Sequence, residues 1–596
     1  MPRPRAEQEL AQMVESMHHE PFYVTGTWID ESLGVYVGWT ARKSSFADGM
    51  PLFNETRDAV LVFSGEDYPP PGTAQRLNER GHSLPLDGPA YLVHLYEEDP
   101  TFPAMLNGTF HGLAIDKLRG TAMLFTDRYA LHRLYYYQSA DAFYFAGEAK
   151  AILSVNPNCR RLENRALGEF LGCGCVMEDR TLFDGVRVMP PAVAWTFSGY
   201  RLENKRTYFT PREWEQEAPL PPDEYYRALR DALSRNLPRY FNGRERIGIS
   251  LTGGLDTRVI MAWLPAAPGS LPCYTFGSMF RDNQDVRVAR RVSRSCEQPH
   301  SVIPVGRDFL SRFADYAERS VYLSDGCVDL SRTSDLYVSE RARDIAPTKI
   351  VGTYGSEVLT GVTMMKPRPL FRGLLAAGAL PYVQEAGVTY DGLRHEHPVT
   401  FAAFRQSPWW HYGVLALEET QLTVRSPFLD NEFIRTAYRA PQTPAATDVR
   451  TRLIAEGRFT LDRIPTDLGV GGTAGPFTSL VSRTFQKFTF RAEYAYDYGM
   501  PHWLARLDRV CSPLHLERLF LGRHKLAHYR IWYREALSEY VRSMLLDSRS
   551  LTRPYLEADG VRAIVTGHLA GHGNYTRELH KVLSLELVHR LFLDQR

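Results

Sequence analysis

The sequence predicts a two-domain α/β protein, in which a sheet-rich first part precedes a part that alternates strands and helices. Three observations support this prediction. A length of 596 residues exceeds what one hydrophobic core normally supports. Up to residue 208, short β-rich runs are separated by turn-forming residues. From Ile247 onward the order is strand, turn, helix and strand, which is typical of a parallel sheet covered by helices on both faces.

The individual elements follow from local patterns. The strand-like runs of the first part lie at residues 59–68, 112–128, 134–147 and 187–209. Residues 209–222 are rich in proline and glutamate, so we expect a linker there, between domains of residues 1–208 and 223–596. The second domain opens with a helical pattern, reaches strands at residues 247–250 and 271–278, and becomes mostly helical toward the end.

Composition narrows the class of protein. Lys and Arg number 70 against 69 Asp and Glu, so no basic excess indicates a nucleic-acid partner. The start lacks an apolar leader, and no window approaches the roughly 20 apolar residues that a membrane span needs. The 7 cysteines are scattered without a CxxC pair, which fits a reducing compartment. We therefore expect a cytoplasmic protein without nucleic-acid or membrane partners; its oligomeric state stays open, a homodimer included.

The stretch at residues 246–263 reads as a nucleotide phosphate loop. A buried strand breaks at a glycine pair, after which Asp256 opens an apolar helix. Such a helix start favours anions, and glycines let the backbone approach a phosphate. Thr252 and Thr257 add hydroxyl groups, and Asp256 can hold a divalent cation. No Walker motif is present, and an ordinary strand-to-helix turn explains the short motif equally well.

Longer segments shift this balance. "LTGGLDT" at residues 251–257 resembles the SGGLDS signature of PP-loop ATP pyrophosphatases. Three segments, at residues 125–153, 180–195 and 424–433, are similar to motif segments of the asparagine synthetase family. Nearly the whole chain therefore resembles that family. The resemblance implies an N-terminal Ntn-hydrolase-like glutaminase domain of αββα type. It also implies a C-terminal PP-loop domain that uses ATP and Mg²⁺.

The resemblance also assigns site residues. Asp256 and Glu357 would bind magnesium, and Tyr354 falls at the position of the catalytic tyrosine of the lactam-forming synthetases. Glu418 and Glu419 are candidate partners of that tyrosine, with Glu385 and Glu396 behind them; a structural tyrosine in a turn is the alternative. The ATP-binding positions would be Ser250, Leu251, Thr252, Gly253, Gly254, Leu255, Asp256, Thr257, Phe276, Gly277 and Gly355.

Two regions depart from the family pattern. Pro2 stands where complete members carry the nucleophilic cysteine, Ser64 replaces an oxyanion-hole asparagine, and Gly88 takes the place of a glutamine-binding aspartate, with Asp87 beside it. We therefore expect no glutamine hydrolysis. A misassigned start would explain Pro2 but not Ser64.

The second departure concerns the catalytic lysine that precedes a glycine-rich loop at residues 463–480. Thr466 and Asp467 occupy its place, so we expect Arg452 or Arg463 to supply a cation as catalytic residue. Three functions stay open. The first is an ATP-dependent ligase that activates a small-molecule or peptide carboxylate as an acyl-adenylate, releasing AMP and pyrophosphate, for attack by an amine. The others are a glutamine-hydrolysing asparagine synthetase and a catalytically retired ATP-binding scaffold.

Overall fold

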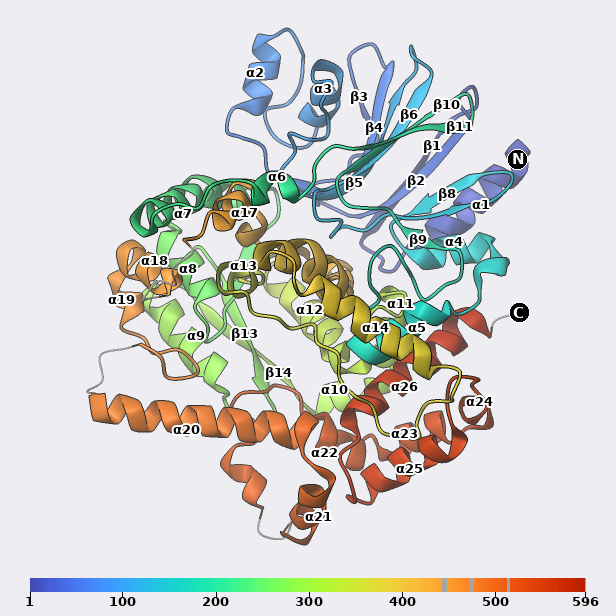
Figure 1. Cartoon of the computed structure of the whole chain (residues 1–596). Helices are drawn as coiled ribbons and strands as arrows, with labels where there is room; N and C mark the ends of the chain where they lie inside the picture. Colours follow the sequence, from blue (N-terminus) through green and yellow to red (C-terminus); the bar gives the residue numbers. More distant parts are fainter. Residues whose placement is uncertain (442–447, 472–475, 512–514, 595–596) are drawn as a thin grey trace.

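The computed structural model describes residues 1–441, 448–471, 476–511 and 515–594. It confirms the predicted class: an N-terminal antiparallel sandwich stands on a C-terminal domain whose core is a parallel sheet (Figure 1). Within these described ranges, no helix is long and apolar enough to cross a membrane.

The larger sheet of the N-terminal domain has six antiparallel strands. The strand β4, next to the edge strand β3, is buried along most of its length, whereas β6 begins with alternating half-buried and buried side chains. In spatial order the strands are β11 (Arg201–Thr207), β10 (Val193–Ser198), β6 (Thr121–Thr126), β5 (Gly108–Asp116), β4 (Ala59–Asp67) and β3 (Leu52–Phe53).

The second layer of the sandwich is divided into two sheets. A hairpin pairs β1 (Tyr23–Asp30) with β2 (Val35–Arg42), and a separate sheet has the order β8 (Phe143–Ala146), β7 (Tyr135–Gln138) and β9 (Arg187–Val188). Helices flank both layers, which gives the αββα arrangement; they are α1 (Arg3–Ser16), α2 (Thr73–Glu79), α3 (Tyr91–Glu98), α4 (Ala149–Val155) and α5 (Asn164–Cys173).

The C-terminal domain is built on five parallel strands. Their order is β14 (His300–Val305), β13 (Cys273–Ser278), β12 (Ile247–Ser250), β15 (Thr348–Ile350) and β16 (Thr423–Arg425). The predicted strands at residues 247–250 and 271–278 are thus confirmed as neighbours. Because β12 is central, the loop after it opens at the carboxyl edge of the sheet, between its two neighbours.

Helices cover both faces of this sheet. Those near the strands are α7 (Pro222–Asn236), α8 (Asp256–Trp263), α9 (Gln284–Ser295), α10 (Arg307–Ser311), α11 (Phe313–Leu323), α12 (Thr333–Ile345), α13 (Gly355–Thr360), α14 (Leu380–Leu393), α15 (Pro398–Phe401), α16 (Tyr412–Glu419), α17 (Asn431–Tyr438), α18 (Val449–Gly457) and α19 (Phe459–Asp462). Those that close the chain are α20 (Pro476–Tyr494), α21 (His502–Cys511), α22 (Tyr529–Arg534), α23 (Ser538–Leu545), α24 (Ser548–Leu551), α25 (Ala558–Leu569) and α26 (Thr576–Val588).

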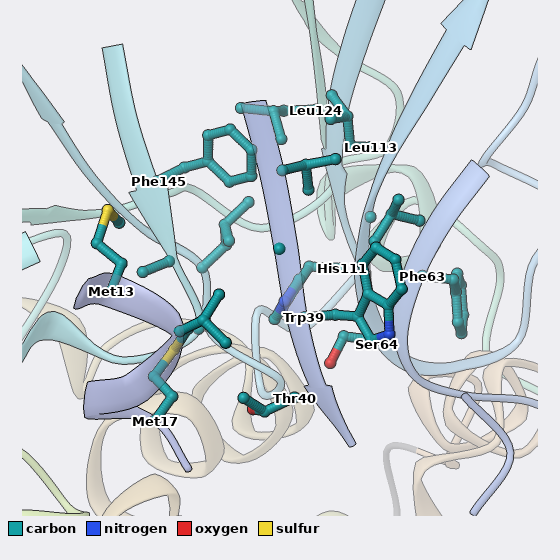
Figure 2. A pocket seen from close by; sticks show the side chains of 18 of the residues that line it. Met13, Met17, Trp39, Thr40, Phe63, Ser64, His111, Leu113, Leu124 and Phe145 are labelled. Atoms are coloured by element: carbon teal, nitrogen blue, oxygen red, sulfur yellow. The ribbon is translucent and has the colours of Figure 1, made fainter. Parts of the chain in front are cut away.

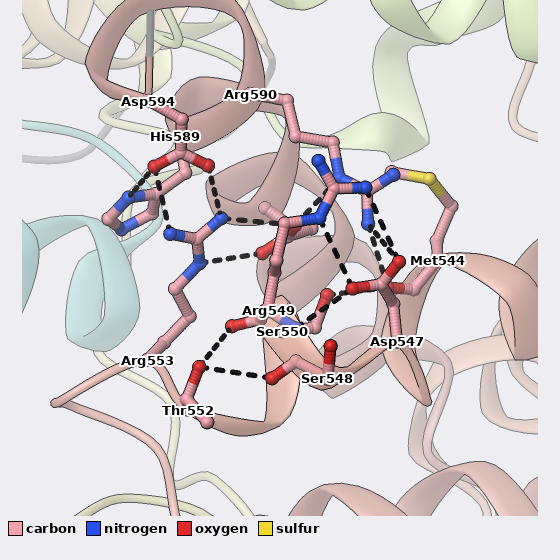
Figure 3. Close-up of polar contacts among 11 residues, drawn as sticks. Met544, Asp547, Ser548, Arg549, Ser550, Thr552, Arg553, His589, Arg590 and Asp594 are labelled. Atoms are coloured by element: carbon pink, nitrogen blue, oxygen red, sulfur yellow. Dashed lines mark hydrogen bonds and ion pairs between the residues drawn. The ribbon is translucent and has the colours of Figure 1, made fainter. Parts of the chain in front are cut away.

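An ion-pair network fastens the end of the chain to this helical region. Arg553 bonds to Asp594 at 2.7 Å and to the buried carboxylate of Glu586 at 2.9 Å. Arg590 reaches the same Glu586 at 2.7 Å, and Figure 3 shows Arg553 directed toward Asp594 and Arg590 toward Asp547. Exposed ion pairs contribute little, but because Glu586 is buried, loss of its arginine partners would leave an uncompensated charge and destabilise this region.

The two domains form an extensive shared interface. The Arg425 side chain at the end of β16 donates to both carboxylate oxygens of Glu66 at 2.7 Å, and Asn107 donates to Asp430 at 2.8 Å. The segment at residues 209–222 packs rather than hanging free, because Phe209 and Trp214 are buried with their ring centroids 4.4 Å apart. The domains are therefore held in one fixed relation.

Candidate active site

The predicted phosphate loop lies between β12 and α8 and lines a cavity of about 530 Å³. Its backbone is crowded on one side. A Cβ atom on Gly253 would come within 2.5 Å of the Asp467 Cβ, whereas one on Gly254 would meet only the Thr252 hydroxyl, at 3.5 Å. The Gly253 N–H donates to Asp285 at 2.7 Å. Glycine at 253 is therefore required by the approach of a neighbouring segment.

The side chains of Asp285 and Asp467 lie next to Gly253 of this loop. Burial and the nearby Asp467 carboxylate together raise the pKa of Asp285 to about 6, against a lowering by the Gly253 N–H. Burial likewise raises the pKa of Asp467. Asp467 occupies the stretch where a catalytic lysine was expected, so this side of the loop carries acidic groups in place of a cation. The glycine-rich loop that follows includes residues 472–475, which lie outside the described residues.

Asp256, the first residue of α8, joins two other segments. Its Oδ2 accepts a hydrogen bond from Ser356 at 2.5 Å, and its Oδ1 accepts one from Arg450 at 2.8 Å. Burial raises the pKa of Asp256, Arg450 and Ser356 lower it, and Glu357 raises it, with a net increase. A Cβ on Gly355 would lie 2.8 Å from the Asp256 Cγ, which explains glycine there.

Asp256 and Glu357 line the same cavity, as the magnesium prediction requires. Two hard oxygen donors whose charges repel each other suit a divalent cation. The buried hydroxyl of Thr257 has no hydrogen-bond partner among the described residues, and the buried Nε2 of His411 has only the Glu357 carboxylate near it, at 3.5 Å; both side chains line the cavity. These orphaned polar atoms indicate a site built to receive a polar ligand, so the residues present fit Mg²⁺ and a nucleotide.

Tyr354 is buried at the start of α13 and has a left-handed backbone, with φ at 77°. Such a conformation is strained for a residue with a side chain and is often kept for function. Burial raises the pKa of its phenol well above 10, and Glu357, Glu419 and Glu418 raise it further. The phenol is therefore neutral, with its ring 5.3 Å from that of His411 in an edge contact.

The structure separates the two candidate partner glutamates. Glu418 lines the same cavity as Asp256 and Glu357 and forms an ion pair with Lys349 at 2.8 Å. Glu419 faces the N-terminal domain instead, where its carboxylate is 3.5 Å from His132 Nδ1. The more distant candidates are engaged elsewhere, Glu385 with Arg165 at 3.1 Å and Glu396 with Arg405 at 2.9 Å.

The cation predictions need correction. Arg452 is exposed and pairs with Asp223 at 2.9 Å, and Arg463 is exposed and lies 4.7 Å from the Phe459 ring; neither lines the cavity. Both point outward because their helices use the opposite face for packing.

The structure instead brings Lys349 and Arg450 to the site. Lys349 is 3% exposed and lines the cavity from β15, next to β12. A lysine directly before the apolar pair Ile350 and Val351, in a strand that is buried along its length, was the sequence signal that could have revealed it. Arg450 had no such signal, because its partner Asp256 is 194 residues away.

The remaining predicted ATP-binding residues fall into two groups. Those that line the cavity are Ser250, Thr252, Thr257 and Phe276. Leu251 and Gly277 are buried beneath it in the sheet, and the Leu251 carbonyl accepts a hydrogen bond from Thr275 at 2.9 Å. Leu255 is half-buried and packs at the edge of the core. The loop thus presents hydroxyls and backbone at its surface and apolar side chains below.

A second, larger cavity of about 760 Å³ lies inside the N-terminal domain and reaches the C-terminal domain. Figure 2 shows Met13 of α1 and Met17, which follows this helix, on one side, with Trp39 of β2, Ser64 and His111 further along the cavity. Thr109 and Val424 line both cavities, so the two meet there. No cysteine lines this cavity among the described residues.

One polar chain crosses the interface from this cavity. Ser64 Oγ is 2.8 Å from His132 Nε2, and the other nitrogen of His132 faces Glu419. Burial lowers the pKa of His132, but the hydrogen bond and charge of Glu419 raise it overall. The stacked His111, in contrast, has its pKa lowered to about 3 by burial and by His132. Asp87 is exposed, and neither it nor Gly88 lines the cavity.

Comparisons with known proteins agree with the two-part fold. A family model described as a glutamine amidotransferase domain matches residues 2–209, and one described as asparagine synthase matches residues 228–455. The glutamine-hydrolysing asparagine synthetase 1 of Bacillus subtilis (strain 168) is 24% identical over 299 residues, which are 48% of this chain and 45% of that protein. Asparagine synthetase 2 of the same organism is 25% identical over 308 residues, 47% of this chain and 40% of that protein.

These matches span less than half the length of either relative. Among solved structures, a glutamine phosphoribosylpyrophosphate amidotransferase from B. subtilis, complexed with ADP and GMP, is 12% identical. It covers 46% of this chain and 53% of its own, with a TM-score of 0.21, too low to add to the comparison.

Proposed function

Because this chain belongs to the asparagine synthetase family, we propose that it is an ATP- and Mg²⁺-dependent ligase that forms an amide bond. In this proposal a carboxylate substrate is activated as an acyl-adenylate, with release of pyrophosphate. An amine then attacks the acyl carbon, and AMP leaves. The substrates are small molecules or peptides rather than nucleic acid.

The observation that supports this proposal most is the charge arrangement of the nucleotide cavity. The carboxylates of Asp256 and Glu357 face the phosphate loop, while Lys349 approaches from the adjacent strand with its ammonium group 2.8 Å from Glu418. A cation in a partly dry cavity stabilises negative charge that develops on phosphorus or on an acyl oxygen. Lys349 thus fills the role for which the sequence offered no lysine.

Asp256 and Glu357 are the residues that would hold Mg²⁺. When bound, the ion would neutralise phosphate charge and orient the triphosphate. The protein's own contribution is to keep Asp256 ionised, since Arg450 and Ser356 offset part of the rise in its pKa that burial causes.

Tyr354 is proposed to position the amine and relay its proton. Its raised pKa excludes a resting tyrosinate at neutral pH, so the phenol can accept a proton only if it passes its own to a neighbouring group. Glu357 lies one helical turn further along α13 and is the carboxylate with the largest effect on its pKa. Free ammonia hardly needs such a relay, so an organic amine, in the same or a second molecule, is the proposed nucleophile.

The N-terminal domain is proposed not to hydrolyse glutamine. In the family, glutamine hydrolysis uses a cysteine thiolate. The polar end of the larger cavity offers Ser64, His111 and His132 instead. A non-catalytic ATP-binding role has one observation in its favour, the pair of acidic side chains, Asp285 and Asp467, behind the loop.

The test uses the full chain with ATP and Mg²⁺ against a panel of carboxylates, with ammonium, glutamine or organic amines as nitrogen source. AMP and pyrophosphate are expected with at least one carboxylate, at equal yield whether glutamine is present or absent. Glutamate release from glutamine would contradict the second part of the proposal. ATP binding without AMP formation across the panel would favour the non-catalytic role.

A further inference from the structure

Four metal-ligating side chains converge at the edge of the N-terminal domain, outside the linings of both cavities. Glu55 lies in the turn between β3 and β4, His82 in the loop after α2, and His94 and Glu97 on α3 (Figure 1). One ligand atom from each residue lies within 4.8 Å of all the others. His94 and Glu97 are three residues apart in a helix, so both project from the same face.

The two separations that involve Glu55 suit metal ligands better than hydrogen-bond partners. His82 Nδ1 lies 3.4 Å from Glu55 Oε1, and His94 Nδ1 lies 3.6 Å from Glu55 Oε2. Both distances exceed the usual hydrogen-bond range of about 2.7–3.2 Å. They are close to the edge of a tetrahedron with bonds of about 2.0–2.1 Å to a central zinc ion, roughly 3.3–3.4 Å. The fourth group, Glu97 Oε2, forms a hydrogen bond with His94 Nδ1 at 3.0 Å in the ion-free chain, and both atoms would have to turn toward a bound ion.

An outer ring of polar groups holds these side chains in place. Nε2 of His82, the nitrogen away from the cluster, is 3.2 Å from Glu98, which is in turn paired with Arg80 at 2.5 Å. Glu97 accepts a hydrogen bond from Asn54 at 2.6 Å through its other oxygen. A carboxylate on the far nitrogen of a histidine fixes its tautomer and is the usual support of a metal ligand.

The summed charge of the four side chains also indicates a divalent cation. With neutral imidazoles the four groups carry two negative charges, which one divalent cation would neutralise, and His94 is only 3% exposed. Two imidazole nitrogens and two carboxylate oxygens form a ligand set typical of zinc. Magnesium and calcium prefer oxygen ligands alone.

We propose that Glu55, His82, His94 and Glu97 bind one zinc ion. Four protein ligands complete a tetrahedral shell, so the ion has a structural role, tying the α2–α3 region to the end of the main sheet. This site is independent of the proposed ligase activity.

The experiment titrates Zn²⁺ into tag-free full-length protein that has been treated with a chelator, by calorimetry and by elemental analysis after gel filtration. One zinc ion per chain is expected, with a rise in the apparent Tm. His82→Ala and Glu97→Gln, at partly exposed positions, should each abolish this stoichiometric binding. Glu98→Gln should weaken it about 10- to 100-fold, because it removes only the support of His82.

Two matched controls separate this site from others. His395→Ala, an exposed histidine in a "HEH" sequence, should leave zinc binding unchanged. Zinc held instead by the magnesium carboxylates would be lost in Asp256→Ala and kept in His82→Ala, the reverse of the expected pattern. That reversal, or the absence of stoichiometric zinc in the correctly folded wild-type chain, would overturn the proposal.

Discussion

The guanidinium of Arg450 lies 2.8 Å from the carboxylate Oδ1 of Asp256 and joins the start of α18 to the phosphate loop. The same arginine donates to Ser356 at 2.6 Å, so one side chain connects three segments of the nucleotide cavity. Because burial raises the pKa of Asp256 and Arg450 lowers it, the arginine sets the pH range in which Asp256 is ionised.

Replacing Arg450 should therefore change the pH dependence of catalysis. In Arg450→Ala the pKa of Asp256 rises further, so the acid limb of the pH–rate profile should move to higher pH. The rate at neutral pH should fall at least about tenfold. AMP formation measured from pH 5 to pH 9 checks this expectation. Arg452→Ala is the matched control: its exposed side chain lies two residues along the same helix, and its profile should coincide with wild type.

Lys349 should be essential for the chemical step. Loss of a preorganised positive group at developing negative charge typically costs about 10²- to 10³-fold in kcat, so Lys349→Met should lose at least about 100-fold. Because its partner Glu418 would be left unpaired and half-buried, the single variant should also be less stable.

The double variant Lys349→Met with Glu418→Gln separates these two effects. It should regain most of the lost Tm in scanning calorimetry while staying inactive. Recovery of activity along with stability would mean that Lys349 has only a structural role.

The two loop glycines should differ sharply in tolerance. Gly253→Ala forces a Cβ atom against Asp467, and overpacking of this kind costs about 1–3 kcal/mol, whereas Gly254→Ala meets only the distant Thr252 hydroxyl. The apparent Tm of the ligand-free protein should fall by about 2 °C or more in the first variant and by less than about 1 °C in the second. Equal shifts would show that the loop does not pack as described.

Asp285 should make the protein less stable as pH rises. Its pKa is raised from 3.8 to about 6 in the folded chain, so between these values the folded state binds more protons than the unfolded state. Asp285→Asn, which keeps an oxygen for the Gly253 N–H, should therefore gain stability over wild type between about pH 4 and pH 6. The gain should be constant above pH 7, at most about 3 kcal/mol, because each pKa unit is worth about 1.4 kcal/mol.

Thermal unfolding measured across this range checks the sign. Asp282→Asn, on the surface beside Arg290, is the control and should stay within about 0.5 kcal/mol of wild type at every pH. A difference between Asp285→Asn and wild type that grows toward low pH would contradict this assignment.

The sequence was sufficient for the fold class and for the strand, glycine turn and helix at residues 247–263. Strands such as Ala59–Asp67 and Cys273–Ser278 have strong local patterns, and Asp256 opens its helix as a short motif predicts. Partners that are distant in sequence could not be found in this way. The Arg450 contact and the proposed zinc cluster depend on how separate segments pack, and the orientation of Arg452 away from the site depends on which helix face is buried.

ATP–pyrophosphate exchange tests the central claim most directly. The full chain is incubated with ATP, Mg²⁺ and labelled pyrophosphate against the carboxylate panel, beside Asp256→Ala and the control Arg452→Ala. The account predicts carboxylate-dependent exchange in wild type and Arg452→Ala and its loss in Asp256→Ala. Exchange that persists in Asp256→Ala, or AMP-forming turnover without any exchange, would contradict an acyl-adenylate formed at this loop.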